Sequence, residues 1–141
     1  MKSLVAYFSA GGKTAGIAKM MAQVTGSDLF EIRPAQPYTA GDLDRDDPRS
    51  RYNRERAEDL DVPMADAAVD LAAYDLVFLG FPLWHGAAPN IIRTFCKAYD
   101  WTGRNVALFT ASGGDIEAAA EKLREHMKGA NIVHTQGMPG G

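Results

Sequence analysis

An apolar strand that runs into a glycine turn and then into a helix opens this chain of 141 residues. Such a connection points backbone N–H groups and a helix start at one spot, where an anion is stabilised. Two glycines in the turn let the backbone approach that anion closely. A tight turn without a ligand is the alternative interpretation. The pattern therefore predicts a phosphate-binding loop made of Ser9, Gly11, Gly12, Lys13 and Thr14.

Two better-known nucleotide loops do not fit this turn. Gly12, Lys13 and Thr14 match the end of the nucleoside-triphosphatase signature, but Tyr7 stands where that signature requires its first glycine. The glycine spacing also differs from the G-x-G-x-x-G fingerprint of dinucleotide-binding folds. Hydrolysis of ATP or GTP is therefore disfavoured.

Composition places the chain among globular proteins, with 46% hydrophobic and 23% charged residues. We expect one domain, residues 1–141, from the length of the chain. No membrane-spanning run or signal peptide is visible, and a single cysteine fits a reducing compartment, so we expect the protein in the cytoplasm. Cys96 is the one cysteine, which excludes an internal disulfide, and the three histidines lack the spacing of metal ligands. A net charge of −3 argues against nucleic acid as the main partner.

Strands and helices alternate along the chain, which predicts an α/β fold with a parallel sheet. Residues 28–32 have partly alternating polarity and are expected at a sheet edge. The charged segment 39–61 is expected to be a surface connection, and its unusual length leaves a binding role as the alternative. The expected strands are 4–8, 28–32, 76–79, 105–110 and 132–135. The expected helices are 65–73, 89–99, 116–127, a turn near 54–59, and a first helix whose core face carries Ile17, Met20, Met21 and Val24.

Ligands of such sheets bind beyond the carboxyl ends of the strands. Two further loops leave strand ends here. One consists of Pro82, Leu83, Trp84, His85 and Gly86, and the other contains Thr110, Ser112, Gly113 and Gly114. Trp84 offers an aromatic platform for a flat ring, although a core tryptophan is the alternative, and the second loop offers backbone N–H groups.

The residues of these loops resemble the flavodoxin-like family, and short-chain flavodoxins in particular. The resemblance rests on Tyr7-Phe8-Ser9 with Gly12 and Thr14, on 80–86 followed by Pro89, on 110–114, and on Pro37-Tyr38-Thr39-Ala40 with Asp47-Pro48, Ser50-Arg51 and Glu55. It implies a three-layer, doubly wound sheet of five strands in the order 2-1-3-4-5, with one FMN bound noncovalently.

The chain departs from the family pattern at two places. Gly11 and Lys13 replace a threonine and an asparagine of the common phosphate loop. The family's final helix is also missing, because 136–141 are rich in glycine. One sheet face is then expected to be partly bare, covered by a second copy in a homodimer or belonging to a shortened protein.

The resemblance implies that the three loops bind FMN and that the protein acts in electron transfer with a redox partner protein or a small-molecule acceptor. The net charge of −3 is small for an electron carrier, because such carriers are usually strongly acidic. It therefore favours the alternative hypothesis of an FMN-dependent NAD(P)H:quinone-type oxidoreductase. The third hypothesis is a phosphate-ligand binding module without redox activity.

Overall fold

Five parallel strands form one sheet in the order β2-β1-β3-β4-β5, in a computed structural model that describes residues 2–65, 68–111 and 115–137. β1 pairs with β2 on one side and with β3 on the other, and β3 pairs with β4. The predicted strand order and the edge position of β2 are both confirmed. The strands are β1 (Ser3–Tyr7), β2 (Asp28–Glu31), β3 (Leu76–Phe81), β4 (Asn105–Thr110) and β5 (Asn131–Gly137).

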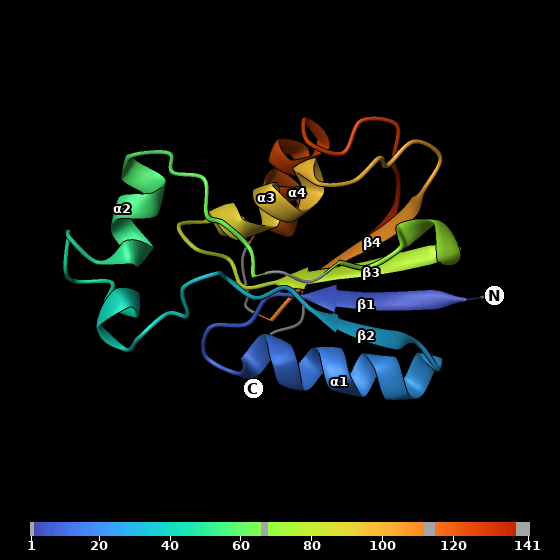
Figure 1. Cartoon of the computed structure of the whole chain (residues 1–141), viewed down its shortest axis with the longest axis horizontal. Coiled ribbons are helices and arrows are strands. Elements are labelled where there is room, and N and C mark those ends of the chain that lie inside the picture. The colour runs from blue at the N-terminus through green and yellow to red at the C-terminus, as the bar shows by residue number, and fades with distance from the viewer. Residues whose placement is uncertain (1, 66–67, 112–114, 138–141) are drawn as a thin grey trace.

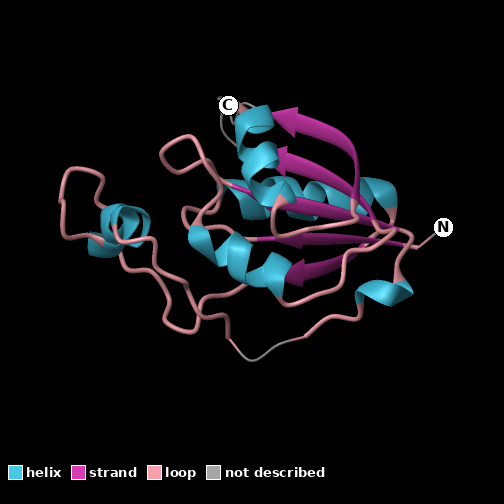
Figure 2. Ribbon diagram, turned by 90° about the horizontal axis from the view of Figure 1, so that it is seen from above, coloured by secondary structure: helices cyan, strands magenta, loops and turns pink. Residues whose placement is uncertain are grey.

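Helices cover the sheet on both sides, and the described residues contain four of them. They are α1 (Lys13–Thr25), α2 (Arg51–Ala57), α3 (Asn90–Lys97) and α4 (Ile116–Arg124), with short 3-10 turns η1 (Gly41–Leu43) and η2 (Leu71–Ala73). α1 lies on one face of the sheet, and α3 and α4 lie on the other (Figure 1). α2 stands apart, beyond the carboxyl ends of the strands, as the second view shows (Figure 2).

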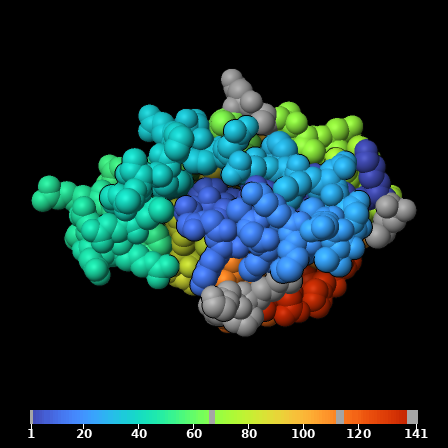
Figure 3. Space-filling view, turned by 90° about the horizontal axis from the view of Figure 1, so that it is seen from below, coloured from blue at the N-terminus to red at the C-terminus, as the bar shows by residue number. Residues whose placement is uncertain are grey.

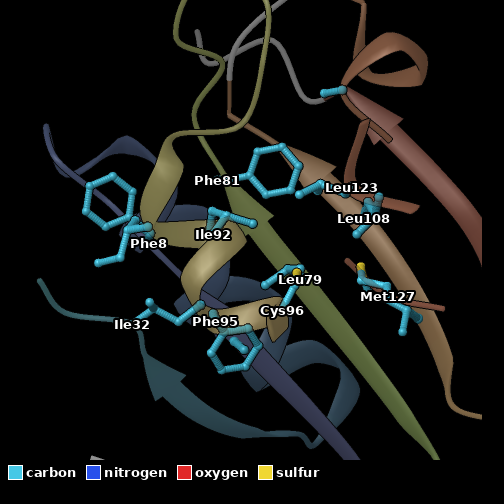
Figure 4. Packing of buried hydrophobic residues seen from close by; sticks show 14 of the residues in the cluster. Phe8, Ile32, Leu79, Phe81, Ile92, Phe95, Cys96, Leu108, Leu123 and Met127 are labelled. Atoms are coloured by element: carbon cyan, nitrogen blue, oxygen red, sulfur yellow. The ribbon is translucent and has the colours of Figure 1, made fainter. Parts of the chain in front are cut away.

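The larger core lies between the sheet and the α3–α4 layer (Figure 4). Ile91, Ile92 and Phe95 form the inner face of α3 and are fully buried. Their spacing is that of an amphipathic helix, and α3 lies within the predicted helix 89–99. Full burial of each such side chain stabilises the fold by roughly 1.5–3 kcal/mol. This layer therefore fixes the positions of the loops that follow β3 and β4.

The core face of α1 differs from the prediction. Thr14, Ala18 and Ala22 are its buried residues, whereas Met20 and Val24 are 58% and 80% exposed. Ile17 and Met21, also in the predicted stripe, pack at the margin of the contact. The prediction followed large apolar side chains, but small residues let the helix approach the sheet more closely than a stripe of large ones would.

The predicted helix over 65–73 is wrong in its described part, where only η2 is helical. Ala65 instead donates its N–H to Arg33 O at 2.7 Å, beside a bridge between Pro34 and Met64, which keeps the chain extended. At the other end the Asp70 carboxylate accepts from Ala72 N and starts a short turn. Alanine content alone could not show this competing pairing.

The described residues cover the α1 face of the sheet only in part. Among the described residues α1 is the one helix on it. The expected absence of a final helix concerns residues 136–141, of which Gln136 and Gly137 belong to β5 and 138–141 lie outside the described residues. Beside α1 an open groove of about 510 Å³ runs over β3, β4 and β5. Its lining consists of Met21, Phe78, Ala107, Leu108, Phe109, His134, Gln136 and Gly137.

Candidate functional site

The turn between β1 and α1 has the backbone shape that the glycines predict. Gly12 has a φ of 94°, in the left-handed region that favours glycine, and is the N-cap residue of α1. It has no side chain with which to cap the helix, so first-turn N–H groups keep their capacity for an anion. Ser9 Oγ accepts from Gly12 N at 3.1 Å, and Thr14 is buried, with 2% of its surface exposed.

A cavity of about 380 Å³ joins this turn to the loop after β3, at the carboxyl ends of the strands. Its volume lies in the range of roughly 300–1,000 Å³ that small-molecule and cofactor sites occupy. In the space-filling view, part of the chain after β3 is visible between the blue start of the chain and the green α2 region (Figure 3). The lining residues are Ser9, Ala10, Gly11, Lys13, Thr14, Leu43, Arg45, Tyr52, Pro82, Leu83, Trp84 and Ala111.

The loop after β3 ends in a tight turn that reverses at His85 and Gly86. Trp84 N donates to Ala87 O at 2.8 Å, and Ala87 N donates back to Trp84 O at 3.0 Å. His85 and Gly86 have φ values of 54° and 74°, the signature of a type I′ turn. Neither residue lines the cavity described above, and the His85 carbonyl accepts from Arg56 Nη1 at 2.6 Å.

Trp84 is held by other aromatic rings. Its ring centroid lies 5.7 Å from that of Phe8, 5.4 Å from Tyr38 and 5.1 Å from Tyr52, and 8% of the residue is exposed. The contacts with Phe8 and Tyr38 are edge-to-face, a favourable arrangement of aromatic quadrupoles. Trp84 is therefore both a core residue and part of the cavity wall, and its neighbours restrict its motion.

The charged segment 39–61, for which a binding role is the alternative prediction, contributes to the cavity. Leu43, Arg45 and Tyr52 line it, and the guanidinium carbon of Arg45 lies 5.3 Å from the centre of the Tyr52 ring. Ser50 caps α2 by accepting from Asn53 N, and this places Tyr52 on the inner side of the helix. A serine at a helix start, followed by a lone aromatic residue, is the signal that could have revealed it.

A buried network fastens α2 to the body of the molecule. The Glu55 carboxylate accepts from Tyr38 Oη and, at 3.0 Å, from Arg51 Nε, and only 7% of Glu55 is exposed. The Arg51 guanidinium also lies 3.8 Å from the centre of the Tyr38 ring. Burial and the hydrogen bond to Glu55 raise the pKa of Tyr38, so its hydroxyl stays protonated. Arg51 and Glu55 thus contact each other and Tyr38.

The third predicted loop is described only at its edges. Thr110 ends β4 fully buried, and Ala111 lines the cavity. Ser112, Gly113 and Gly114 lie outside the described residues. Asp115 caps α4, because its carboxylate accepts from Ala118 N at 3.2 Å.

Other kinds of site find no support in the described ranges 2–65, 68–111 and 115–137. No group of three or more histidine, cysteine, aspartate or glutamate residues there could hold a metal ion. No helix there has the length and apolar content needed to cross a bilayer. Cys96 is buried in the core, and this burial raises the pKa of its thiol, as expected for a packing residue.

Comparison with known protein families shows that the chain matches one of them. The profile of the family described as Flavodoxin matches residues 2–140. A "putative flavoprotein" from Bacteroides uniformis ATCC 8492 is 38% identical, with a TM-score of 0.91, over 99% of this chain and 90% of that one. Another from Bacteroides eggerthii DSM 20697 is also 38% identical, with a TM-score of 0.89, over 96% of this chain and 87% of that one.

A more distant structure shares the fold. It is a flavoprotein in complex with FMN from Lactobacillus acidophilus NCFM, 24% identical, with a TM-score of 0.74, over 96% of this chain and 92% of that one. A search of curated protein sequences found no match.

Proposed function

The chain belongs to the flavodoxin family, and we propose that its 141 residues form one domain that binds FMN noncovalently and transfers electrons. The observation that carries the proposal is the cavity at the carboxyl ends of the strands. Two loops that the sequence singled out separately, Ser9–Thr14 and Pro82–Trp84, meet in it. The related fold of the Lactobacillus acidophilus flavoprotein, which was solved with FMN, supports the choice of ligand.

The phosphate end of FMN fits the turn before α1. The uncapped start of the helix and the Ser9 and Thr14 hydroxyls supply donors to an anion. Lys13 and Arg45 add positive charge to the same cavity. This charge makes up for the hydrogen-bond donor that is lost because Gly11 stands in place of the threonine of the common family loop. Hydrogen bonds to a charged phosphate are about twice as strong as neutral ones.

The flavin ring is proposed to lie against Trp84, next to Pro82 and Leu83. Tyr52 and Leu43 then close the opposite side of the cavity, so that water is excluded from a large apolar surface. The turn at His85 and Gly86 is proposed to meet the polar edge of the ring. From the other side Thr110, Ser112, Gly113 and Gly114 are proposed to offer backbone groups.

Bound FMN supplies the redox chemistry, and the chain tunes it through stacking, hydrogen bonds and nearby charge. Trp84 is suited to hold the ring in one orientation because three other aromatic rings restrict it. The partner of the electron transfer is proposed to be a redox protein or a small-molecule acceptor.

An FMN-dependent NAD(P)H:quinone-type oxidoreductase is the second candidate. The net charge of −3 favours it over a carrier that is steered to basic partner proteins. Steady-state oxidation of NADH or NADPH with a quinone acceptor separates the two. Turnover well above that of free FMN indicates the oxidoreductase, and electron exchange with partner proteins alone indicates the carrier.

The visible spectrum of the purified protein tests the proposal itself. We expect a bound flavin spectrum, with the chromophore released on denaturation and identified as FMN. Fluorescence titration of the flavin-free protein with FMN should then give stoichiometric binding. A protein that binds inorganic phosphate but neither FMN nor riboflavin would instead be a phosphate-ligand binding module.

A further inference from the structure

A second cavity, of about 210 Å³, lies between α2, α3, α4 and the turn after Trp84. It shares only Tyr52 and Trp84 with the cavity proposed for FMN, and no residue of the loop Ser9–Thr14 lines it. The two cavities therefore lie on either side of the Trp84–Tyr52 pair. Of the residues proposed to contact FMN, Tyr52, Trp84 and His85 also line this second cavity, whereas its cationic residues have no part in the function proposed above.

The charged side chains of this cavity leave an excess of positive charge. Three cationic residues, Arg56, Arg93 and Lys122, line it together with two carboxylates, Glu55 and Asp59. Both carboxylates are already engaged. The Glu55 carboxylate accepts from Arg51 Nε at 3.0 Å, and Asp59 pairs with Arg93 at 2.6 Å.

Arg56 and Lys122 have no carboxylate partner among residues 2–65, 68–111 and 115–137. Within these ranges the one hydrogen bond of the Arg56 side chain goes to the neutral His85 carbonyl, which does not compensate the charge of the guanidinium. A guanidinium has five N–H donors, so most of its capacity is left for a ligand. These two cations thus create a local positive field in a chain whose net charge is −3.

Besides the charged groups and the polar side chains of His85, Asn90 and His126, the lining has an apolar wall that is partly flat. Trp84, Pro89, Ala119 and Leu123 form it, and all four are buried. A hydrated inorganic anion gains nothing from such a wall, whereas a ring gains both burial and aromatic contact. The volume lies below the roughly 300 Å³ at which sites for drug-sized ligands begin. A whole dinucleotide is therefore too large, and a single substituted ring fits.

We propose that this cavity binds a small, flat organic monoanion, an aromatic carboxylate of about the size of benzoate. Its carboxylate would lie at Arg56 and Lys122, and its ring against Trp84 and Leu123. Charge-assisted hydrogen bonds from a guanidinium to a carboxylate give orientation as well as affinity. The site needs no FMN for any of these contacts.

Isothermal titration calorimetry of the full chain, saturated with FMN, tests the proposal with benzoate as the probe. Benzamide is the matched neutral ligand, and we expect it to bind at least about tenfold more weakly, as for the loss of a charge-assisted contact. Lys122→Gln and Arg56→Gln should each weaken benzoate binding about fivefold or more. Lys19→Gln, on the exposed side of α1, is the matched control and should leave it unchanged.

Equal binding of benzoate and benzamide would overturn the assignment, and so would benzoate affinity that neither Lys122→Gln nor Arg56→Gln reduces. Lys122→Gln is the cleaner variant, because no hydrogen bond of that side chain supports the fold in the described part of the chain. If inorganic phosphate binds to the cavity as tightly as benzoate does, the proposal that the ligand is aromatic is wrong. The titration is repeated without FMN. Benzoate binding can therefore be measured even if the protein does not bind FMN.

Discussion

Thr14 is a buried hydroxyl in a loop that offers an anion backbone donors, and it carries the first prediction. We expect Thr14→Ala to weaken FMN binding by about 1–3 kcal/mol, the loss of one hydrogen bond to a charged group. Fluorescence titration of flavin-free protein with FMN measures the change.

Thr14→Ser is the matched control, because it keeps the hydroxyl and removes one methyl group. It should retain most of the affinity. If Thr14→Ala and the wild type bind FMN equally, Thr14 does not contact the phosphate.

Gly86 carries the second prediction at this scale. Its φ of 74° suits glycine, but no atom lies within 4 Å of an added Cβ, so Gly86→Ala would strain the turn without a steric clash. We expect Gly86→Ala to shift the reduction potentials of bound FMN, because the His85–Gly86 peptide is proposed to meet the polar edge of the ring. Potentiometric titration followed by absorbance measures them.

Gly86→Asn is the control for this position, since asparagine tolerates a left-handed backbone better than alanine. Its potentials should lie closer to those of the wild type. Potentials that are identical in all three proteins would show that this peptide does not respond to the flavin.

The structure brings together several of the residues that the sequence singled out. Seven of the predicted residues, among them Thr14 and Trp84, line one cavity, because loops at the ends of neighbouring parallel strands must lie together. Tyr52 and Arg45 were missed, because they reach the cavity from a distant charged segment whose composition favours solvent. That Trp84 also packs in the core could not be decided from its own loop, since Tyr38 and Tyr52 come from elsewhere.

At the scale of elements, the Tyr38–Glu55 contact attaches α2 to the rest of the fold, and it predicts a pH dependence. The pKa of Tyr38 is raised above its ordinary value of 10.0, first by burial and then by the hydrogen bond to Glu55. Below pH 10 the folded and unfolded chains both keep this proton, and the stabilisation is complete. Above it the unfolded chain loses the proton first, so the free energy of unfolding falls as pH rises.

Tyr38→Phe isolates this contribution, because burial also raises the pKa of Tyr7 and a hydrogen bond to Asp28 raises that of Tyr74. Urea denaturation of both proteins at about pH 9 and about pH 11 should show the steeper loss in the wild type, by up to about 1.4 kcal/mol per pH unit. Parallel losses in the two proteins would contradict the assignment.

The contact between β3 and β4 depends on one glycine. Gly80 pairs with Phe109 in the sheet, and a Cβ at Gly80 would lie 2.1 Å from Phe109 Cζ. The ring therefore packs on a site that only glycine leaves open. We expect Gly80→Ala to lower the free energy of unfolding by about 1–3 kcal/mol through overpacking, measured by chemical denaturation.

Two further variants separate overpacking from a general loss of glycine. Gly16→Ala, in α1 with no atom within 4 Å of an added Cβ, should instead stabilise the protein by up to about 1 kcal/mol. Combining Gly80→Ala with Phe109→Leu should cost less than the sum of the two single changes. Strict additivity would mean that the Phe109 ring is not the obstacle.

Helices and strands could be predicted where their buried faces carry large apolar residues. The strands and the inner face of α3 follow that rule, and their positions were predicted within a few residues. α1 does not, because its contact with the sheet is made by Thr14, Ala18 and Ala22. The segment 65–73 failed for another reason, since the backbone of Ala65 pairs with Arg33, far away in sequence.

For the whole molecule, the sequence predicted the sheet order through a family resemblance, whereas alternation of strands and helices alone predicted only a parallel sheet. The unequal cores of the two faces follow from the same topology. Two helices, α3 and α4, cover one face of the sheet, and among the described residues α1 alone packs on the other. The larger hydrophobic cluster accordingly lies on the α3–α4 side.

The last prediction concerns the open groove beside α1. Half-buried Met21 and Phe78 line it beside the buried Phe109, and an open apolar groove of this kind usually marks an interface. We propose that a second copy of the chain covers it, most simply about a two-fold axis, so the protein should sediment as a dimer at micromolar concentration. Met21→Lys places a charge in the groove and should shift the protein to monomer, because an unpaired charge cannot be buried cheaply.

Met20→Lys is the matched control, since Met20 neighbours Met21 in sequence but is 58% exposed and lies outside the groove. It should leave the sedimentation unchanged. A wild-type protein that is monomeric and does not bind a hydrophobic dye would contradict both the dimer and the exposed patch. If the wild type is monomeric but binds the dye, and Met21→Lys abolishes that binding, the patch is exposed and no second copy covers it. A dimer that Met21→Lys and Met20→Lys leave equally intact would place the interface on another face of the molecule.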